Sequence, residues 1–338
     1  MIVNVTLEEA YARASAVLRR KMEYSVNLPR KAERLALPYD SSGGYYLAFS
    51  GGKDSQALLH IAQLAGVRYE GFMSLTSVDP PEVIRFVKRQ YPEVTLIKPK
   101  ASIYQIAVQK NLLPTQRVRW CCNEYKENAG AGRVTLIGIR HQESTRRAKR
   151  NEVEISSRKF SGTLEGFEQY RQEKLSRSTK GVNITNATSE RTVGCISGKE
   201  SLLISPIIHW TERDVWEFLN RVVMVPHCEL YDQGWRRIGC IGCPMSSYRH
   251  KLMENRRWPH VRQHWIKAII AIRNGGVYQR GLTTANPVVR YWVGLEAAIL
   301  QARPSTTTVT SCIPTRNTGG GEEPTDRAGF PMAHRLTA

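Results

Sequence analysis

The amino-acid sequence predicts an α/β protein built on a doubly wound parallel sheet. Two observations indicate this fold class: short apolar runs alternate with segments of helical periodicity, and the first apolar run ends in a glycine turn that opens a helix. The run is Tyr45–Phe49, the turn contains Gly51 and Gly52, and helical spacing resumes at Ala57. Because ligands of such sheets bind beyond the carboxyl ends of the strands, we expect the binding site at this turn.

The other elements are predicted in an alternating order. A helix over Thr6–Arg34 and a loop signal at Ser41–Gly44 precede the first strand. Strands are then expected at Val67–Ser74, Val94–Ile97 and Val134–Ile139, and helices at Pro81–Tyr91 and Ile103–Asn111. Further along, an apolar segment at Leu202–Ile208 is followed by a helix capped by Thr211–Asp214, and by helices at Pro259–Arg273 and Pro287–Arg303.

Composition divides the sequence into six parts. Residues 151–200 are polar and weakly periodic, which predicts an insertion or flap, and residues 304–338 lack apolar periodicity, which predicts a disordered tail. The remaining parts are an N-terminal helical extension at 1–44, a core at 45–150 that holds the glycine turn, the rest of that domain with a C-x-x-C pair and helices at 201–275, and a C-terminal helix at 276–303.

The formal net charge of +19 is the strongest global feature of the sequence. Such an excess favours a polyanionic partner, nucleic acid ahead of an anionic membrane, because phosphate contacts release counterions. A solvated basic surface without a partner is the alternative. Two basic segments are candidates for the contact, Arg140–Arg150 and Arg256–Lys267; in the second, Trp258 and Trp265 are either stacking platforms or core residues.

No apolar run is long enough to span a membrane, and residues 1–30 lack the apolar centre of a signal peptide. We therefore predict a cytoplasmic protein without membrane contact.

The segment Ser50–Ser55, S-G-G-K-D-S, predicts a phosphate site. Neither Gly51 nor Gly52 has a Cβ to block a ligand, and the backbone N–H groups that follow point outward at the positive end of the helix dipole. Ser50 and Ser55 are candidate donors to phosphate oxygens, Lys53 supplies a cation, and Asp54 is suited to Mg²⁺. A metal–nucleotide complex is the expected ligand; the alternative is an ordinary turn whose Asp54 or Ser55 caps the helix.

A basic turn leaves the strand predicted at Val134–Ile139. It faces the same crevice as the phosphate site, so Arg140 and Arg147 are candidates for contact with nucleotide or backbone phosphates. A solvated helix face is the alternative.

Two cysteine pairs lie far apart in the sequence, Cys121-Cys122 and Cys240-x-x-Cys243. Soft ligands that converge in the fold indicate a metal centre. Adjacent cysteines diverge from one another and suit a wide cluster, so a four-iron four-sulfur cluster is favoured over zinc (Zn²⁺), and buried apolar filling is the third possibility. Three further cysteines occur singly, which favours structural over catalytic roles for them: Cys195, Cys228 and Cys312.

Five motifs in order resemble the phosphoadenosine phosphosulfate (PAPS) reductase family, over about residues 45–251. Beside S-G-G-K-D-S they are Arg119-Trp-Cys121-Cys122, Gly138-Ile-Arg140-x-x-Glu143-Ser144-x-x-Arg147, Ser205-Pro206-Ile207-x-x-Trp210-Thr-x-x-Asp214-Val-Trp216 and Leu230-Tyr-Asp232-x-Gly234-x-x-x-Ile238-Gly-Cys240-x-x-Cys243-Pro. The loop resembles the PP-loop of ATP pyrophosphatases, which cleave ATP between the α and β phosphates and leave an adenylated substrate. The resemblance implies an adenine nucleotide α-hydrolase-like fold.

The cysteine set matches the cluster-bearing members of the family, adenylylsulfate reductases and DNA phosphorothioation ATP pyrophosphatases. The resemblance therefore implies Cys121, Cys122, Cys240 and Cys243 as ligands. Two departures point from sulfate reduction toward ATP use: the loop is intact where those reductases carry a degenerate one, and the residues around Cys312 lack the Glu, Gly and His of the reductase nucleophile motif.

The leading hypothesis is that ATP with Mg²⁺ adenylates a nucleic acid, DNA being favoured over tRNA, and that sulfur from a cysteine desulfurase partner then displaces AMP. Lys53, Asp54, Arg140 and Arg147 are the predicted catalytic residues, because charge develops on the α-phosphate and the departing pyrophosphate. The alternatives are a sulfonucleotide reductase with Cys312 as nucleophile and a non-catalytic nucleic-acid-binding iron–sulfur module.

Overall fold

The computed structural model describes residues 5–37, 43–177 and 200–274. All of them belong to one unit, residues 1–296. The predicted helix at Pro287–Arg303, the tail at 304–338, much of the predicted flap, and both Cys195 and Cys312 lie outside the described residues. No described helix is long and apolar enough to cross a membrane.

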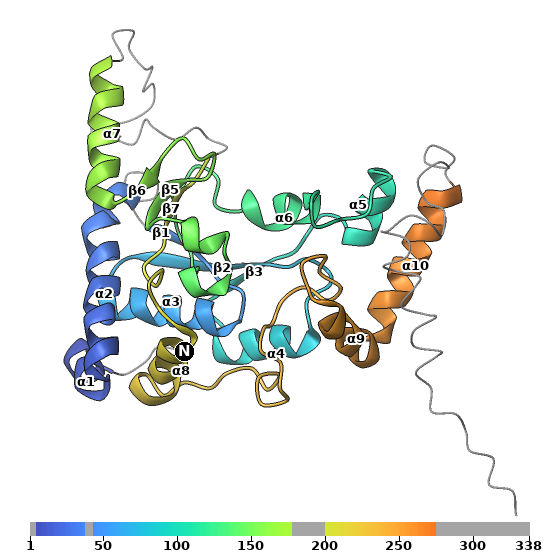
Figure 1. The fold of residues 1–338 in the computed structure, drawn as a ribbon, viewed down its shortest axis with the longest axis horizontal. Helices are drawn as coiled ribbons and strands as arrows, with labels where there is room; N and C mark the ends of the chain where they lie inside the picture. The colour runs from blue at the N-terminus through green and yellow to red at the C-terminus, as the bar shows by residue number, and fades with distance from the viewer. Residues whose placement is uncertain (1–4, 38–42, 178–199, 275–338) are drawn as a thin grey trace, which may run out of the picture. The chain divides into compact units, whose positions relative to one another are not determined.

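A seven-stranded sheet of order β3-β2-β1-β4-β7-β5-β6 forms the centre of this unit (Figure 1). The strands are β1 (Tyr45–Ala48), β2 (Tyr69–Ser74), β3 (Thr95–Ile97), β4 (Val134–Leu136), β5 (Val153–Ile155), β6 (Ser161–Gly162) and β7 (Leu202–Ile204). The first four of these and β7 pair in parallel. The predicted α/β class and parallel sheet are therefore confirmed.

The sheet also has an antiparallel edge that the sequence reading did not predict. β5 pairs antiparallel with both β6 and β7. Only the short turn 156–160 joins β5 to β6, and a connection of that length returns the chain antiparallel. The start of the predicted flap at 151–200 thus belongs to the sheet and continues into α7 (Leu164–Arg177).

Helices lie on both sides of the sheet, as a doubly wound fold requires. In Figure 1, α3 and α4 are drawn on one side of β2 and α5 and α6 on the other. The α-helices other than α7 are α1 (Leu7–Arg13), α2 (Ala16–Ala36), α3 (Lys53–Ala65), α4 (Pro81–Gln90), α5 (Ile103–Gln109), α6 (Trp120–Cys122), α8 (Glu212–Glu217), α9 (Tyr248–Arg257) and α10 (Pro259–Asn274). Short turns are η1 (Asn123–Glu127), η2 (His141–Glu143), η3 (Arg147–Lys149) and η4 (Phe218–Val222).

Capping residues set where several helices begin. The single helix predicted at Thr6–Arg34 is two helices, because Ser15 caps α2 and its side chain accepts from Leu18 N. The predicted cap of α8 is confirmed, since the Thr211 side chain accepts from the backbone N–H of Asp214.

Helix α2 is joined to the segment that precedes α8. Trp210 Nε1 donates to Ser25 Oγ at 2.8 Å, and Ser25 Oγ donates to the Pro206 carbonyl at 2.7 Å. Lys21 Nζ lies 2.5 Å from Asp214 Oδ2. Pro206, Trp210 and Asp214 all belong to the motif that begins S-P-I-x-x-W-T, so this motif holds α2 on the domain.

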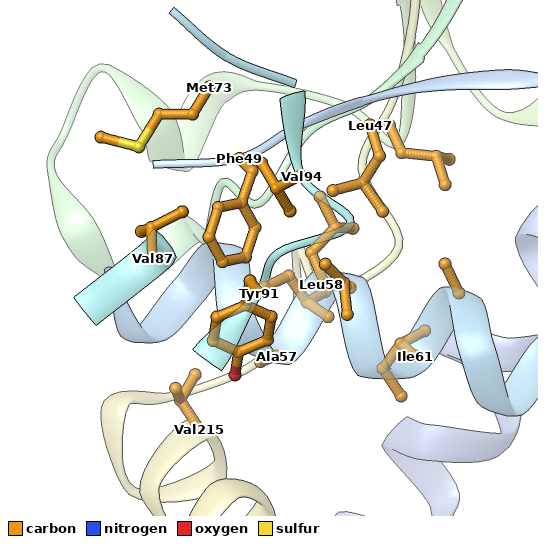
Figure 2. Close-up of a cluster of buried hydrophobic side chains, with 14 of the residues drawn as sticks. Leu47, Phe49, Ala57, Leu58, Ile61, Met73, Val87, Tyr91, Val94 and Val215 are labelled. Carbon is orange, nitrogen blue, oxygen red and sulfur yellow. The ribbon is translucent and has the colours of Figure 1, made fainter. Parts of the chain in front are cut away.

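A cluster of buried side chains supports the turn that follows β1 (Figure 2). Leu47 and Phe49 pack with Leu58 of α3 and with Val87 and Tyr91 of the α4 segment. The Phe49 and Tyr91 ring centroids are 4.9 Å apart. Full burial of such side chains contributes about 1.5–3 kcal/mol each, so the turn rests on packed core.

Two polar side chains of α3 are buried beneath the same turn. Gln56 Nε2 donates to the Tyr91 hydroxyl at 2.8 Å and to the Pro226 carbonyl at 2.9 Å. His60 contacts Gln63 Oε1 through Nδ1 at 2.8 Å and the Tyr91 hydroxyl through Nε2 at 3.1 Å. Burial lowers the pKa of His60 to about 4.

We predict that His60 makes the stability of the protein depend on pH. An unfolded histidine titrates near 6.5, so its contribution is complete above about pH 6.5 and is lost as the pH falls toward 4. The loss is at most about 3 kcal/mol. Urea unfolding of His60→Gln between about pH 7 and pH 5 should show a shallower decline than wild type. Equal slopes for His60→Gln and wild type would contradict this account.

Candidate nucleotide and cysteine site

The turn after β1 requires glycine at position 51 for two reasons. Its φ is 71°, a left-handed conformation that favours glycine. A Cβ there would lie 2.7 Å from Val83 Cγ1 and 2.8 Å from Val87 Cγ2, so α4 already fills the space. The turn leads directly into α3 at Lys53.

The first turn of α3 presents backbone N–H groups at the carboxyl edge of the sheet. Gln56 N makes the first intrahelical bond, to the Gly52 carbonyl at 3.0 Å. The N–H groups of Lys53, Asp54 and Ser55 precede that bond and have no carbonyl partner inside the helix. Such groups and the helix dipole favour an anion.

The two loop serines bond each other. Ser55 Oγ accepts from Ser50 N at 3.1 Å, lies 3.1 Å from Ser50 Oγ, and donates to the Gly52 carbonyl at 2.8 Å. The serines predicted as phosphate donors therefore brace the loop in this structure.

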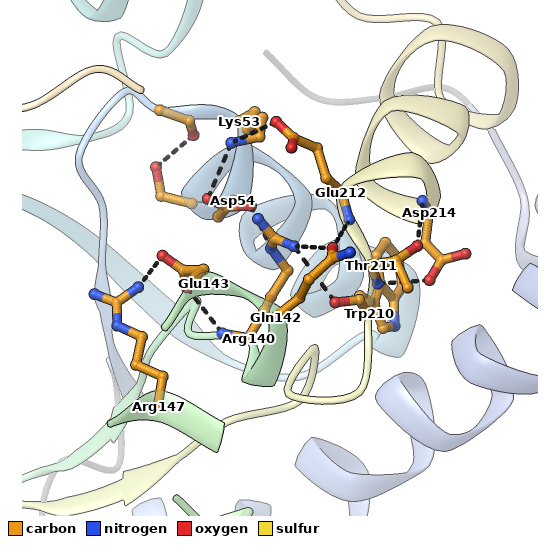
Figure 3. A network of polar contacts seen from close by, with 12 residues as sticks. Lys53, Asp54, Arg140, Gln142, Glu143, Arg147, Trp210, Thr211, Glu212 and Asp214 are labelled. Atoms are coloured by element: carbon orange, nitrogen blue, oxygen red, sulfur yellow. Dashed lines mark hydrogen bonds and ion pairs between the residues drawn. The ribbon is translucent and has the colours of Figure 1, made fainter. Parts of the chain in front are cut away.

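Four charged side chains meet beside the loop (Figure 3). Lys53 Nζ lies 3.5 Å from Asp54 Oδ2 and 3.6 Å from Glu212 Oε1. Arg140 Nε donates to Asp54 Oδ1 at 2.7 Å, and the Arg140 side chain is only 4% exposed. The predicted magnesium ligand and one predicted phosphate cation thus engage each other, and two cations balance two carboxylates.

The segment after β4 passes against the first turn of α3. A Cβ at Gly138 would lie 2.9 Å from the Asp54 carbonyl oxygen, so only glycine permits this approach. Glu143 Oε1 accepts from Arg140 N at 2.9 Å, and Glu143 also pairs with Arg147. The G-I-R-x-x-E-S-x-x-R motif therefore packs against the first turn of α3 and is held by hydrogen bonds and ion pairs of its own.

A cleft of about 440 Å³ connects the end of β1 with the cysteine segments. Its lining includes Ser50, Arg147, Cys122, Cys240 and Cys243. The volume is within the range of pockets that hold small-molecule ligands. The structure thus brings one end of the predicted phosphate loop, one predicted arginine and three of the four predicted cysteines to a single space. Lys53, Asp54, Arg140 and Cys121 lie outside its lining.

All four predicted cysteine ligands line a second, smaller cavity of about 30 Å³. Cys121 and Cys122 come from α6, and Cys240 and Cys243 from the loop before α9. The Thr76 hydroxyl donates to Cys240 Sγ at 3.4 Å. Two segments more than a hundred residues apart in sequence therefore converge, as the cysteine pattern predicted.

The surroundings shift these thiols unequally: one cysteine, Cys122, is driven toward the thiolate, whereas burial raises the pKa of Cys243. A hydrogen bond from Cys121, with the positive charges of Arg119 and Lys126, lowers the pKa of Cys122 to about 6. The same hydrogen bond, together with burial, raises the pKa of Cys121. Lys126 Nζ donates to Cys240 Sγ at 3.3 Å, and the charge of Cys240 raises the pKa of Lys126. Thiolates are the form that binds metals.

The fit of a metal centre differs between a single ion and a cluster. Within the described ranges, no group of three or more His, Cys, Asp or Glu side chains is placed to hold one metal ion. Four thiols around one cavity nevertheless match the Cys₄ donor set of an iron–sulfur cluster, in which each thiolate binds an iron of its own.

The basic segment at Arg256–Lys267 combines a charged exterior with an apolar interior. Trp258 and Trp265 are 4% and 2% exposed, so both are core residues and neither offers a face for base stacking. Arg256, His260 and Lys267 are exposed, whereas Arg257 pairs with Glu82 at 2.8 Å. Of the two alternatives predicted for these tryptophans, stacking platforms or core residues, the structure confirms the second.

Sequence reasoning missed the contacts that surround the loop. Tyr231 and Glu212 both lie inside motifs that the sequence displayed, yet the Tyr231 hydroxyl accepts from Lys53 N across 178 positions. Membership in a motif could have marked both residues as candidates. Spacing within one motif gives no information about contacts between motifs, so the contacts themselves could not be predicted.

The sequence model of the phosphoadenosine phosphosulfate reductase domain matches residues 44–246. An uncharacterised protein of Methanocaldococcus jannaschii is 27% identical over 226 residues, which cover 66% of this chain and 46% of that protein. The chain thus spans less than half the length of this relative. An adenosine 5'-phosphosulfate reductase of Lysinibacillus sphaericus is 34% identical over 59 residues, covering 18% of this chain and 25% of that reductase.

Among solved structures, the phosphate complex of a phosphoadenylyl-sulfate reductase from Candida auris aligns with 67% of this chain and 96% of its own chain. The TM-score is 0.37 and the sequence identity is 16%.

We predict that Asp54 and Arg140 are energetically coupled. Asp54→Asn leaves the buried Arg140 without its carboxylate and should cost about 2–4 kcal/mol of unfolding free energy. Arg140→Gln should cost less, because Asp54 is 21% exposed and keeps Lys53 beside it. The double variant should lose clearly less than the sum of the two losses. Urea denaturation measures all three variants, and Arg147→Gln, whose pair with Glu143 is more exposed, should cost under about 1 kcal/mol. Strictly additive losses would show that the pair has no such role.

Proposed function

We propose, because this chain belongs to the phosphoadenosine phosphosulfate reductase family, that it is an ATP pyrophosphatase that adenylates a nucleic acid for sulfur incorporation. The observation that carries the proposal is the intact S-G-G-K-D-S loop, which opens a helix of 13 residues at the carboxyl edge of the sheet. A triphosphate fits a loop of this kind better than a substrate that is already adenylated. The net charge of +19 supports a nucleic acid as the acceptor.

The proposed first step is transfer of the adenylyl group. An acceptor oxygen attacks the α-phosphorus of ATP, the bond from that phosphorus to the bridging oxygen breaks, and pyrophosphate leaves with the electron pair. The N–H groups of Lys53–Ser55 and the Lys53 ammonium stabilise the charge that develops on the phosphates. Arg147, which lines the cleft, is placed to neutralise phosphate charge there.

Asp54 and Arg140 have different roles in this proposal: Asp54 binds the metal ion, and Arg140 positions Asp54. Arg140 holds Asp54 Oδ1 and acts as a positioning residue. Asp54 Oδ2 is then the oxygen suited to the Mg²⁺ that ATP brings with it.

The proposed second step replaces AMP by sulfur. A sulfur nucleophile attacks the activated phosphorus of the acceptor, and AMP leaves with its oxygen. A cysteine desulfurase is the proposed donor; its persulfide sulfur is at the zero oxidation level, so a dithiol reductant must supply two electrons and is itself oxidised to a disulfide. DNA is favoured over tRNA as acceptor, and the free thiols of the described cysteines suit a reducing compartment such as the cytoplasm.

We assign Cys121, Cys122, Cys240 and Cys243 to a four-iron four-sulfur cluster. The cavity shared by the four thiols supports the assignment, because thiolates are the usual ligands of such clusters. When bound, such a cluster supplies one-electron redox chemistry or holds sulfur beside the cleft. Lys126 and Thr76, which donate to Cys240 Sγ, are its candidate hydrogen-bond partners.

A sulfonucleotide reductase is the second candidate function. The relatives named adenosine 5'-phosphosulfate reductase favour it. In that case adenylylsulfate or PAPS would occupy the cleft and no pyrophosphate would be released.

Anaerobically purified protein is expected to release pyrophosphate from ATP and Mg²⁺ when DNA is present. Lys53→Ala should lower this rate by about a hundredfold or more, because a cation beside the phosphates is lost. Lys31→Ala, which removes an exposed lysine of α2, should leave the rate unchanged. Phosphate released after pyrophosphatase treatment gives the rate.

Two outcomes would sink the proposal. Thioredoxin-dependent sulfite release from adenylylsulfate or PAPS, without pyrophosphate release from ATP, would establish the reductase. Salt-sensitive DNA binding that is indifferent to Lys53→Ala and Asp54→Ala, without any turnover, would identify a binding module.

The cluster assignment predicts iron and acid-labile sulfide in the anaerobic protein, with a brown colour. Cys122→Ser and Cys240→Ser should each remove most of both elements, because a thiolate ligand is lost. Cys228→Ala should keep them, since Cys228 is buried away from the shared cavity. Elemental analysis that finds zinc in place of iron would overturn the assignment.

A further inference from the structure

Tyr231 contacts the phosphate loop, and none of the steps above uses it. Its hydroxyl accepts from Lys53 N at 2.9 Å, and a Cβ at Gly52 would lie 3.4 Å from the same oxygen. Lys53 Nζ lies 5.8 Å from the centroid of the Tyr231 ring. The hydroxyl therefore occupies the first N–H group of the loop.

A bound phosphate would compete for that group. The N–H groups of Lys53, Asp54 and Ser55 are the ones that precede the first intrahelical bond, so they form the anion-binding end of α3. Burial raises the pKa of Tyr231, so its oxygen is a neutral phenol at neutral pH. A phosphate oxygen makes the stronger, charge-assisted bond to the same N–H and should displace the phenol.

Tyr231 also belongs to the segment that carries the C-x-x-C pair. Its turn is closed by Tyr231 N donating to the Cys228 carbonyl at 3.0 Å and by Trp235 N donating to the Leu230 carbonyl at 3.0 Å. Five positions after Trp235 the chain reaches Cys240, which lines the cleft. Tyr231 and two of the four cysteines therefore belong to one continuous segment, which begins with a hydrogen-bonded turn.

We propose that nucleotide binding displaces the Tyr231 hydroxyl from Lys53 N, and that Tyr231 thereby couples occupancy of the phosphate loop to the segment that leads to Cys240. The inference rests on the proposed function in taking ATP as the ligand of the loop. The coupling is reciprocal: if ATP changes the affinity of the cysteine segment for a second ligand by some factor, that ligand changes the affinity for ATP by the same factor.

The affinity of Tyr231→Phe for ATP tests the displacement. Phenylalanine keeps the ring but cannot accept from Lys53 N, so the free loop loses a hydrogen bond that ATP otherwise has to replace. Calorimetric titration of the full chain with Mg²⁺ and ATP should give roughly three- to tenfold tighter binding than wild type. Inorganic pyrophosphate, the second probe, should show the same shift. The control is Tyr248→Phe, whose tyrosine is 54% exposed and should not alter affinity.

Hydrogen–deuterium exchange of residues 228–243 tests the coupling on the same proteins. In wild type, ATP should speed exchange in this segment; in Tyr231→Phe, exchange should already be fast and should not respond to ATP. Unchanged or weaker ATP binding by Tyr231→Phe, or wild-type exchange that ignores ATP, would overturn the inference and leave the proposed function intact. Wild-type protein that binds neither ATP nor pyrophosphate would overturn both.

Discussion

The buried contact between Asp54 and Arg140 is the constraint on which the rest of the site depends. Arg140 is 4% exposed, so each charge would be costly to bury without its partner. The contact requires the chain after β4 to press against the first turn of α3, and Gly138 is the residue that allows it. Through Gln142, whose side chain accepts from Glu212 N at 2.6 Å, the start of α8 joins the same unit. The loop is thus fixed from beneath, while the N–H groups of Asp54 and Ser55 have no carbonyl partner inside the helix.

The cleft begins at the end of β1, directly before this fixed loop. Ser50 marks one end of this space, Arg147 lines it, and three of the four cysteines mark the other end. Residues from the end of β1, from the segment after β4 and from both cysteine segments therefore line one volume. Family membership alone does not predict this arrangement; it depends on the convergence of α6 and the C-x-x-C loop.

Local signals in the sequence were enough to predict the loop and the fold class. Gly51 needs its left-handed φ for reasons contained in S-G-G-K-D-S, and the parallel core follows from alternating apolar runs and helices. Contacts between motifs were not predictable in the same way. The rule that ligands bind at the carboxyl edge placed Arg140 near the loop but could not show that its side chain donates to Asp54. The β5–β6 hairpin was missed because V-E-I is too short for a periodic signal.

The most direct test of this account is the structure of the full chain with Mg²⁺ and an ATP analogue that cannot be cleaved between its α and β phosphates. The account predicts a triphosphate on the N–H groups of Lys53–Ser55, Asp54 still bound to Arg140, and the α-phosphate in the cleft that Cys122, Cys240 and Cys243 line. A triphosphate bound elsewhere, or one separated from those cysteines by a closed wall, would contradict it.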